Sequence, residues 1–432
     1  MKKLIIIIAF FISLQTVAQS TPIPDINFEI FLINLGVDHG IANGSILNSD
    51  AEAVLNLNIS IPTISDLTGL EAFKNLKTLL IANYPGATCP IYTMDSLNLL
   101  YIVGTTIPSL DVSNNLMLDQ LTIEYTPITS LNVSANTQLK KLILNHINIG
   151  QLDITNNTAL EEFSAKHFSC DSIDFSQNTN LNSIGIISLG LDTIDLSLNT
   201  ALLALTYNDS ATSIDITNNI NLWLLRLEYN LFSNIDLSQN TAIEYLFIGN
   251  NNLDSLKVSN LPNLKRLECD SNAIKKLDLR FNPLLELLDC RSNNLSELNI
   301  KNGNNSSIAN TMFNATNNPN LNCIEVDNVS YSYGNWTNKD SQSYYTTYCN
   351  YDLSVESEKE SNILIFPNPV NSQFKINSLE QPIGIVITDL AGKKVFDSPY
   401  QSTYNIQHLN VGFYIVTIQF SDRFINKKIE MK

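Results

Sequence analysis

The sequence is poor in the residues and motifs on which enzymes and nucleic-acid-binding proteins depend. Its 432 residues include only four histidines, and 25 lysines and arginines stand against 42 aspartates and glutamates, for a formal net charge of -17. An acidic chain repels phosphate backbones, which makes nucleic acid a poor partner. The sequence has no GxSxG, no HExxH and no glycine-rich phosphate loop. We therefore expect no enzyme activity, no catalytic residues and no cofactor.

Paired cysteine motifs are missing as well. The six cysteines show no CxxC spacing and no cluster with histidine. A structural zinc site needs four such ligands at short spacings, so we expect no bound metal.

Long hydrophobic runs are absent except at the N-terminus. There, Lys2 and Lys3 precede an apolar stretch over residues 4–14, and small residues follow up to Ala18. The stretch is too short to span a bilayer as a mature helix. This pattern predicts a signal peptide over residues 1–18, cleaved after Ala18, with a retained membrane anchor as the alternative. The mature chain is then not an integral membrane protein.

The sequence is rich in one repeated phrase. It begins with Leu or Ile, followed usually by Asp or Asn, an apolar residue, Ser or Thr, and Asn two places later. It starts at Leu110, Leu131, Leu152, Ile173, Ile194, Ile214, Ile235, Leu256, Leu277, Leu298 and Leu321. The step is 21 residues, apart from one step of 20 and one of 23. A second phrase, LxxLxLxxNxL, occupies residues 243–253, 264–274 and 285–295.

These phrases resemble the short leucine-rich repeats of bacterial proteins over roughly residues 65–325. A stretch such as Leu246-Phe247-Ile248 places two apolar side chains on one face of a strand and the third on the other. One unit cannot bury that apolar face alone, whereas stacked units form a continuous core. We expect a β-rich solenoid of short 21-residue repeats with a parallel β-sheet on its concave face. The unit is too short for a long helix, so the convex side should be extended or turn-like.

Asparagine recurs at two fixed positions of the repeat. An amide side chain both donates and accepts, so it can satisfy backbone groups buried in tight turns. Early units replace the first set by Thr126, Ile147, Phe168 and Leu189, which should alter the turn that follows the strand. We predict two structural ladders. The first is Asn230, Asn251, Asn272 and Asn293, and the second is Asn115, Asn136, Asn157, Asn178, Asn199, Asn219, Asn240 and Asn282.

Both ends of a solenoid need a cover. Residues 19–64 are predicted to form an N-terminal cap with a small helix that starts after Asp25 and ends at Gly36. Residues 326–350 resemble the closing segment of secreted repeat proteins, and this resemblance implies a disulfide between Cys323 and Cys349. Cys269 and Cys290 share one inward repeat position, where they form either a disulfide or two buried thiols.

The composition changes after Cys349. Residues 351–361 are polar and charged and are predicted to be a linker. Residues 362–432 contain short alternating apolar runs separated by turns, which predicts a small antiparallel β-sandwich. This segment closely resembles the C-terminal sorting domain of type IX secretion cargo, and the residues that carry the resemblance include Pro367, Asn368, Pro369, Gly392, Gly412 and Tyr414.

The resemblance implies export by the type IX secretion machinery across the outer membrane, followed by removal of this domain. The mature protein is then either released or attached to a surface lipopolysaccharide. The alternative is a carbohydrate-binding sandwich that stays attached.

Outward strand positions vary while the inward positions stay apolar, so the concave face is the candidate site for a ligand. Exposed aromatic and arginine side chains are typical of interface hot spots. We expect the ligand, an extracellular protein or glycan, to contact Arg226, Tyr229, Tyr245, Phe247 and Arg266 in an adhesion role. The alternative is a structural component of the cell envelope without a specific soluble ligand. His146 and His167 share a repeat position, as a metal-binding or pH-sensing pair or as two ordinary surface residues.

Overall fold

The computed structural model describes residues 19–167, 170, 172–349, 363–378, 381–389, 393–420 and 424–432. The predicted signal peptide and linker therefore lie outside the described residues. The chain divides into two compact units, residues 1–349 and 350–432. None of the described helices is both long enough and apolar enough to cross a membrane.

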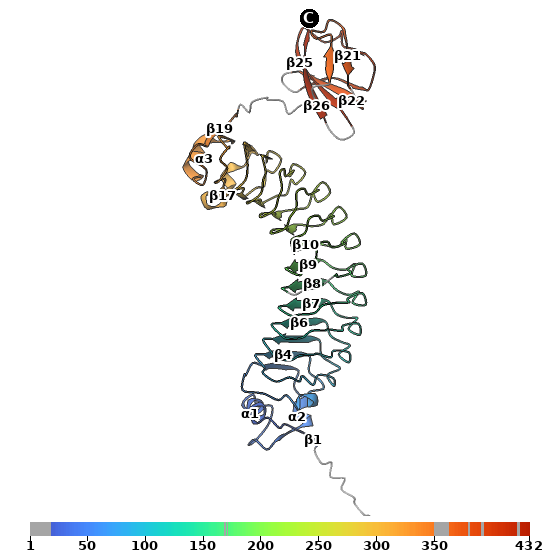
Figure 1. The fold of residues 1–432 in the computed structure, drawn as a ribbon, viewed down its shortest axis with the longest axis vertical. Helices are drawn as coiled ribbons and strands as arrows, with labels where there is room; N and C mark the ends of the chain where they lie inside the picture. Colours follow the sequence, from blue (N-terminus) through green and yellow to red (C-terminus); the bar gives the residue numbers. More distant parts are fainter. Residues whose placement is uncertain are drawn as a thin grey trace, which may run out of the picture. The chain divides into compact units, whose positions relative to one another are not determined.

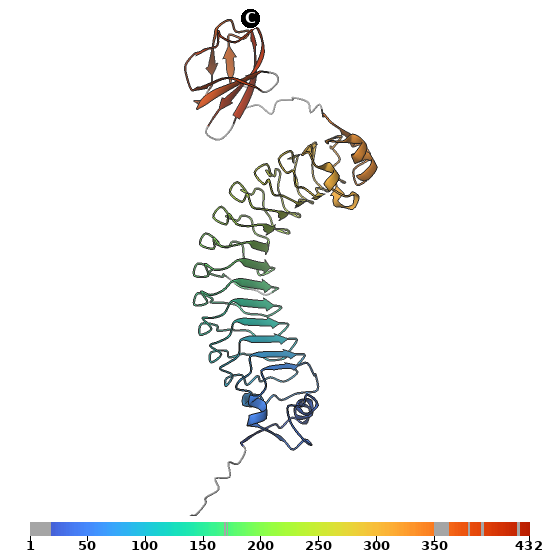
Figure 2. The ribbon, with the colours of Figure 1, turned by 180° about the vertical axis from the view of Figure 1, so that it is seen from behind.

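The first unit is a solenoid built on one parallel sheet of 13 strands, which line its concave side while turns form the other side (Figures 1 and 2). The strands are β3 (Asn56–Ile59), β4 (Thr78–Ala82), β5 (Leu99–Val103), β6 (Gln120–Glu124), β7 (Lys141–Asn145), β8 (Glu162–Lys166), β9 (Ser183–Ile187), β10 (Ala204–Asn208), β11 (Leu224–Arg226), β12 (Tyr245–Phe247), β13 (Arg266–Glu268), β15 (Leu287–Asp289) and β17 (Phe313–Asn314). The predicted solenoid is confirmed. The sheet begins at β3, inside the segment predicted as the cap.

Each strand pairs with the equivalent residues of the next repeat, so the register follows the sequence period. In β7, Leu142 and Leu144 are fully buried, while the three residues between and beside them are half-exposed. The equivalent positions of β6 and β8 lie directly beside them. One slip by a single residue would turn every apolar side chain outward, so burial fixes the register.

The second asparagine ladder runs through the interior of the turns. Asn178 is fully buried, and its side-chain nitrogen donates to the carbonyl oxygens of Ile154 (3.0 Å) and Asn157 (2.9 Å). The other members make the same pair of bonds to the preceding turns. Their side-chain oxygens have no hydrogen-bond partner among the described residues. This ladder therefore acts only as a donor, rather than as both donor and acceptor.

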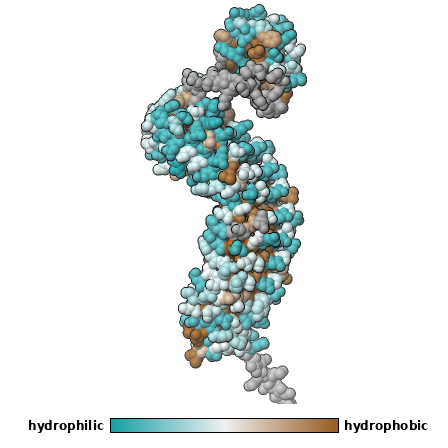
Figure 3. Space-filling view, in the orientation of Figure 1, coloured by the Kyte–Doolittle hydropathy of each residue, from teal (hydrophilic) through white to brown (hydrophobic). Residues whose placement is uncertain are grey.

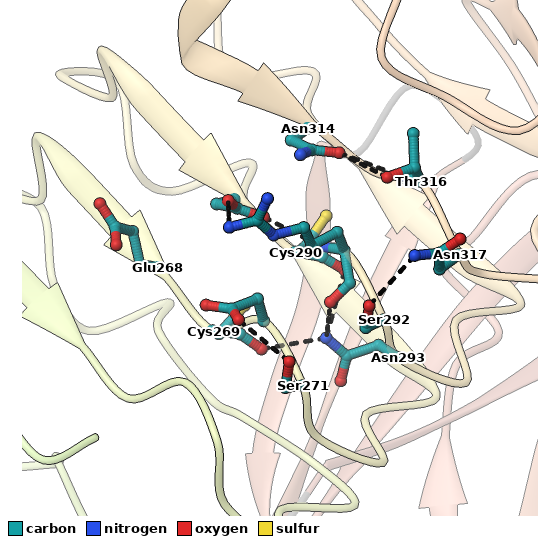
Figure 4. Close-up of polar contacts among 12 residues, drawn as sticks. Glu268, Cys269, Ser271, Cys290, Ser292, Asn293, Asn314, Thr316 and Asn317 are labelled. Carbon is teal, nitrogen blue, oxygen red and sulfur yellow. Dashed lines mark hydrogen bonds and ion pairs between the residues drawn. The ribbon is translucent and has the colours of Figure 1, made fainter. Parts of the chain in front are cut away.

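The first ladder uses both ends of the amide. Asn293 donates to the carbonyl oxygens of Cys269 (3.0 Å) and Cys290 (3.2 Å), as Figure 4 shows, and its oxygen accepts from the backbone N–H of Ile274 (3.0 Å). Where asparagine follows the strand, as in β12 and β13, the strand has three residues; β6 to β9, which lack it, have five. The hydrogen bonds of this asparagine therefore favour a turn directly after a short strand, whereas the strand continues for two more residues in the repeats that lack it.

The N-terminal cap holds helices α1 (Ile26–Asn34) and α2 (Asn48–Glu52) and a hairpin of β1 (Ser20–Pro22) and β2 (Ser45–Leu47). Asp25 accepts hydrogen bonds from the backbone N–H groups of Asn27 (2.8 Å) and Phe28 (3.2 Å), as a helix-capping residue does. Its second oxygen accepts from the backbone N–H groups of Ser65 (2.7 Å) and Asp66 (3.0 Å). One carboxylate therefore both starts the helix and attaches the cap to the solenoid.

The C-terminal end of the solenoid adds a second parallel sheet, which the sequence did not predict. Its order is β14 (Lys276–Asp278), β16 (Glu297–Asn299), β18 (Cys323–Glu325) and β19 (Tyr344–Thr346). Helix α3 (Val329–Asn335) precedes the buried Trp336, whose ring stacks on Phe313 at 4.5 Å. A disulfide joins Cys323, at the start of β18, to Cys349. Three short 3-10 turns occur at Leu70–Ala72, Asn305–Ser307 and Asn310–Met312.

The second unit is a β-sandwich with its own core. One sheet has the order β20 (Leu364–Phe366), β21 (Gln373–Asn377) and β24 (Tyr404–Asn405). The other has the order β23 (Lys394–Pro399), β22 (Gly384–Asp389), β25 (Gly412–Gln419) and β26 (Phe424–Met431), all antiparallel. Phe374 and Tyr404 are buried partners on β21 and β24 of the first sheet, and their rings stack at 5.2 Å. The predicted antiparallel architecture is confirmed.

The asparagine ladder predicts a sharp contrast between two neighbouring substitutions. Asn178→Ala leaves two buried carbonyl oxygens without a donor and should lower the free energy of unfolding by about 2–4 kcal/mol. Asn180 donates one exposed bond to the Thr158 carbonyl oxygen, so Asn180→Ala should cost less than about 1 kcal/mol. Urea unfolding of the two variants measures both values, and equal losses would contradict a structural role for the buried amide.

Candidate functional site

The candidate ligand residues lie on three adjacent strands of the concave sheet. The register places Leu224, Tyr245 and Arg266 in one transverse row and Arg226, Phe247 and Glu268 in the next. Both rows are outward positions, since the residue between them on each strand is fully buried. The structure thus brings Arg226, Tyr245, Phe247 and Arg266 together from three repeats, as the sequence period predicts.

Phe247 is the centre of this arrangement. The guanidinium carbon of Arg226 lies 4.0 Å from the centre of the Phe247 ring, and that of Arg266 lies 5.1 Å from it. Only 5% of Phe247 is exposed. The expectation of an exposed Phe247 ring is therefore wrong, because two guanidinium groups cover it. Each such contact is worth roughly 0.5–1 kcal/mol at a surface site.

Two carboxylates hold the arginines in place. Arg226 pairs with Glu228 at 2.7 Å, and Arg266 pairs with Glu268 two residues along its own strand. Both guanidinium groups remain about two-fifths exposed, with side-chain exposures of 38% and 42%. Exposed ion pairs contribute little to stability, so their main effect here is to orient the arginines. We refer to Arg226, Phe247 and Arg266 as the cation–aromatic stack.

The two tyrosines of the candidate set lie toward opposite ends of the strands, since Tyr245 begins β12 and Tyr229 follows the end of β11. Tyr245 is half-buried, and its ring meets Trp223 edge-to-face at 5.7 Å. Tyr229 follows β11 with a positive φ of 58° and is 65% exposed. Sequence reasoning missed Trp223, which is 42% exposed. The sequence feature that could have indicated an exposed Trp223 is its repeat position, which polar residues, Glu244 and Lys265, occupy in the next two repeats.

Carboxylates gather at the C-terminal end of the concave sheet. Burial raises the pKa of Asp289, and the nearby Asp270 and Glu268 raise it further, against the opposing effect of Arg291. Arg291 donates its backbone N–H to Asp289 (3.2 Å) and pairs with it through its side chain (3.2 Å). The charged form of Asp289 is thus less favourable in the folded protein than in water.

His146 and His167 form part of a stack of rings where the strands end. The ring of Tyr125 lies 4.3 Å from that of His146, which lies 4.5 Å from that of His167, and the planes are nearly parallel. Rings stacked face to face do not direct their nitrogens at one ion, for which metal–nitrogen distances of about 2.1 Å are needed. Across the described ranges, no group of three or more potential ligands could hold a metal.

Cys269 and Cys290 directly follow the adjacent strands β13 and β15 and are free, fully buried thiols (Figure 4). Burial raises the pKa of both thiols, so neither is activated as a nucleophile. The structure favours the interpretation of two apolar core residues over a disulfide at this position.

The turn carboxylates are also structural. Asp153, Asp174, Asp195, Asp215 and Asp236 each accept from the backbone N–H two residues later. These hydrogen bonds, together with those of the following Ser and Thr hydroxyls, lower the pKa of every one of them. A paired general acid requires a raised pKa, so this ladder has the wrong environment for glycoside hydrolysis.

The residues that carry the sorting resemblance are also placed together, within the second unit. Asn368 donates its side-chain N–H to the Lys428 carbonyl oxygen (3.0 Å) and accepts from the backbone N–H of Glu430 (3.0 Å). This fixes the Pro367-Asn368-Pro369 turn on the last strand, β26. Gly412 begins β25, and the Tyr414 hydroxyl donates to the Asn410 carbonyl oxygen (2.9 Å). Gly392 lies outside the described residues.

Comparison with known proteins agrees with both units. Residues 364–432 match a family described as the secretion system C-terminal sorting domain. The functional domain of InlJ from Listeria monocytogenes is similar in structure, with a TM-score of 0.59 and 19% identity over 96% of this chain and 99% of that one. An internalin, inlF, from the same organism has a TM-score of 0.56 and 19% identity over 78% and 100% of the two chains. No curated protein matches the sequence.

The chain is therefore a leucine-rich-repeat protein of the solenoid class. It ends in a C-terminal sorting domain of the type IX secretion system, which handles it as cargo and exports it to the cell surface or the medium.

Substitution of Asp289 and of Asp278 by asparagine should change the stability of the protein in opposite directions at neutral pH. Asp289 has a raised pKa, so its folded form binds a proton more tightly than its unfolded form. Asp289→Asn should therefore stabilise the protein at neutral pH, and the gain should vanish as the pH falls below the ordinary aspartate value of about 3.9. Asn at this position can still accept from the Arg291 backbone.

Asp278 is the matched control. A side-chain hydrogen bond from Arg280 lowers the pKa of Asp278, which is exposed on the second sheet. Asp278→Asn should slightly destabilise the protein at neutral pH, and that loss should disappear as the pH falls through the lowered pKa. Thermal melts of both variants between pH 3 and 7 measure the two signs, and a destabilising Asp289→Asn at pH 7 would contradict the assignment.

Proposed function

We propose that this protein is an exported, non-catalytic recognition module that mediates adhesion at the bacterial cell surface. It binds an extracellular protein or glycan through the concave sheet over β11, β12 and β13. The observation that carries the proposal is the cation–aromatic stack, with the exposed Tyr229 after the end of β11 and Tyr245 at the start of β12.

The stack supports binding because it is already ordered. Each guanidinium group is held by the Phe247 ring and by a glutamate, so little side-chain freedom remains to be lost when a ligand binds. Arginine and tyrosine are enriched among the residues that dominate interface energies. Both can also contact a sugar, by hydrogen bonds from the guanidinium and by stacking on the phenol ring.

The two-unit organisation supports a cargo that separates from its sorting domain. The sandwich and the solenoid have separate cores, so removal of the sandwich leaves the solenoid core unchanged. Cleavage in the segment between the two units would then release a folded recognition module, either free or joined to a surface lipopolysaccharide.

A binding screen with matched variants tests the proposal. The purified chain is applied to glycan and extracellular-protein arrays beside the double variant Arg226→Ala/Tyr229→Ala. The control double variant is Arg280→Ala/Tyr92→Ala, whose side chains are exposed but lie outside the concave sheet. We expect a specific ligand whose affinity falls at least about tenfold in the first variant and is unchanged in the control.

Two outcomes would contradict this assignment. A ligand bound equally well by the Arg226→Ala/Tyr229→Ala variant would place recognition on another face. The absence of any specific ligand would instead favour a structural component of the cell envelope.

A further inference from the structure

The residues immediately before the strands β4 to β13 and β15 form a continuous row along one side of the solenoid. Each backbone N–H in this row donates to the carbonyl oxygen of the preceding member, at 2.8–3.0 Å at every step. We call it the pre-strand row. Its central members are Lys140, Glu161, Asn182, Leu203, Trp223, Glu244, Lys265 and Glu286. The hydrogen bonds fix these residues in register, at one strand spacing of about 4.8 Å per step.

The middle of the pre-strand row is apolar and exposed. Leu203 is 43% exposed and Trp223 is 42% exposed, whereas the members on either side are polar or charged. Leu198 and Ile220, in the turns that lead into these two strands, are more than half exposed. Figure 3 shows one face of the molecule, on which most residues are hydrophilic and hydrophobic residues are scattered among them. A clustered apolar patch with a polar rim is typical of a protein interface.

The polar residues on either side of this patch are complementary at equal distances, and the two outer pairs have opposite charges. Counting outward from the point between Leu203 and Trp223, the second members are Asn182 and Glu244. The third members are Glu161 and Lys265, and the fourth are Lys140 and Glu286. Each position on one side therefore has a complementary group at the same distance on the other side.

This order is what an antiparallel pair of identical rows requires. In a two-fold dimer, each residue meets the one at the same distance on the other side of the axis. Leu203 would face Trp223 of the second copy, Glu161 would face Lys265, and Lys140 would face Glu286. Because both rows are the same hydrogen-bonded ladder, all the pairs come into register together. A two-fold axis that points out of the concave face superimposes the two curves and keeps both concave sheets on one side.

We propose that the solenoid pairs with a second copy of itself, antiparallel, through the pre-strand row centred on Leu203 and Trp223. The apolar centre supplies the affinity, and the charge pairs around it set the register. The edge-to-face contact with Tyr245 orients the Trp223 ring. Lys265 already pairs with Glu244 in its own chain at 2.7 Å, so Glu161 of the second copy would join an existing ion pair. The dimer doubles the concave surface available to a ligand.

Sedimentation velocity of the full chain over a range of concentrations tests whether it dimerises. We expect a dimer in the parent protein and a monomer in Trp223→Asp under the same conditions. The control is Leu231→Asp, because Leu231 is 50% exposed but follows its strand on the other side of the sheet. A monomeric parent protein, or a dimer that Trp223→Asp leaves unchanged, would overturn the proposal.

A charge exchange tests the antiparallel register. Lys140 and Glu286 are seven steps apart in the pre-strand row, about 34 Å at the strand spacing, so they cannot interact within one chain. Neither forms an ion pair within the parts of the solenoid that the structure describes. Lys140→Glu and Glu286→Lys should each weaken the dimer by about tenfold, because each places like charges opposite each other twice.

The double variant Lys140→Glu/Glu286→Lys restores opposite charges and should regain the parent dissociation constant. Recovery in the double variant requires contact between two copies, since the distance excludes an effect within one. A double variant as weak as the single ones would overturn the antiparallel register. The ligand screen uses residues outside the pre-strand row, so the two proposals can fail independently.

Discussion

Inside the solenoid, every turn points backbone carbonyl oxygens into a space from which water is excluded. An unpaired carbonyl there costs roughly 1–3 kcal/mol, and the repetition of the turn along the solenoid multiplies that cost. The buried asparagines meet this demand, each amide donating to the carbonyl oxygens of preceding turns, as Asn178 does to Ile154 and Asn157. Because each bond joins one repeat to its neighbour, the same interaction holds successive turns in line and supports the strand register that burial of the apolar residues fixes.

A fixed register has a direct consequence for function. Since the inward positions stay apolar, the outward positions vary most freely from repeat to repeat, and each lies beside the equivalent position of the neighbouring repeats. That is how Arg226, Phe247 and Arg266 from three repeats build one stack, and how residues 21 apart form the pre-strand row. A binding surface on this scaffold is formed by residues at the same outward position of successive repeats.

The sorting domain is not built from repeats. Its strands pair antiparallel and its core is separate from that of the solenoid. The Pro367-Asn368-Pro369 turn is bound to the last strand through Asn368, so the recognition residues and the chain end form one local structure. The sorting residues therefore belong to a domain whose core is its own.

The sequence alone determined the solenoid and the positions of the two ladders, because each depends on a spacing repeated along the chain. The separate sandwich followed from its alternating apolar runs, and its sorting role from the resemblance of its motifs to a known sorting domain. It also identified which repeats supply the candidate surface. Only the tertiary structure decided how the outward side chains interact across strands: Phe247 is covered by two arginines, Trp223 is propped by Tyr245, and His146 stacks between Tyr125 and His167. The sequence likewise did not predict the second parallel sheet at the C-terminal end of the solenoid. The reason is that the repeat period fixes which backbone segments lie side by side. The conformation of a long side chain also depends on residues at other positions of the adjacent repeats, as Arg266 lies over Phe247, and the period does not specify those residues.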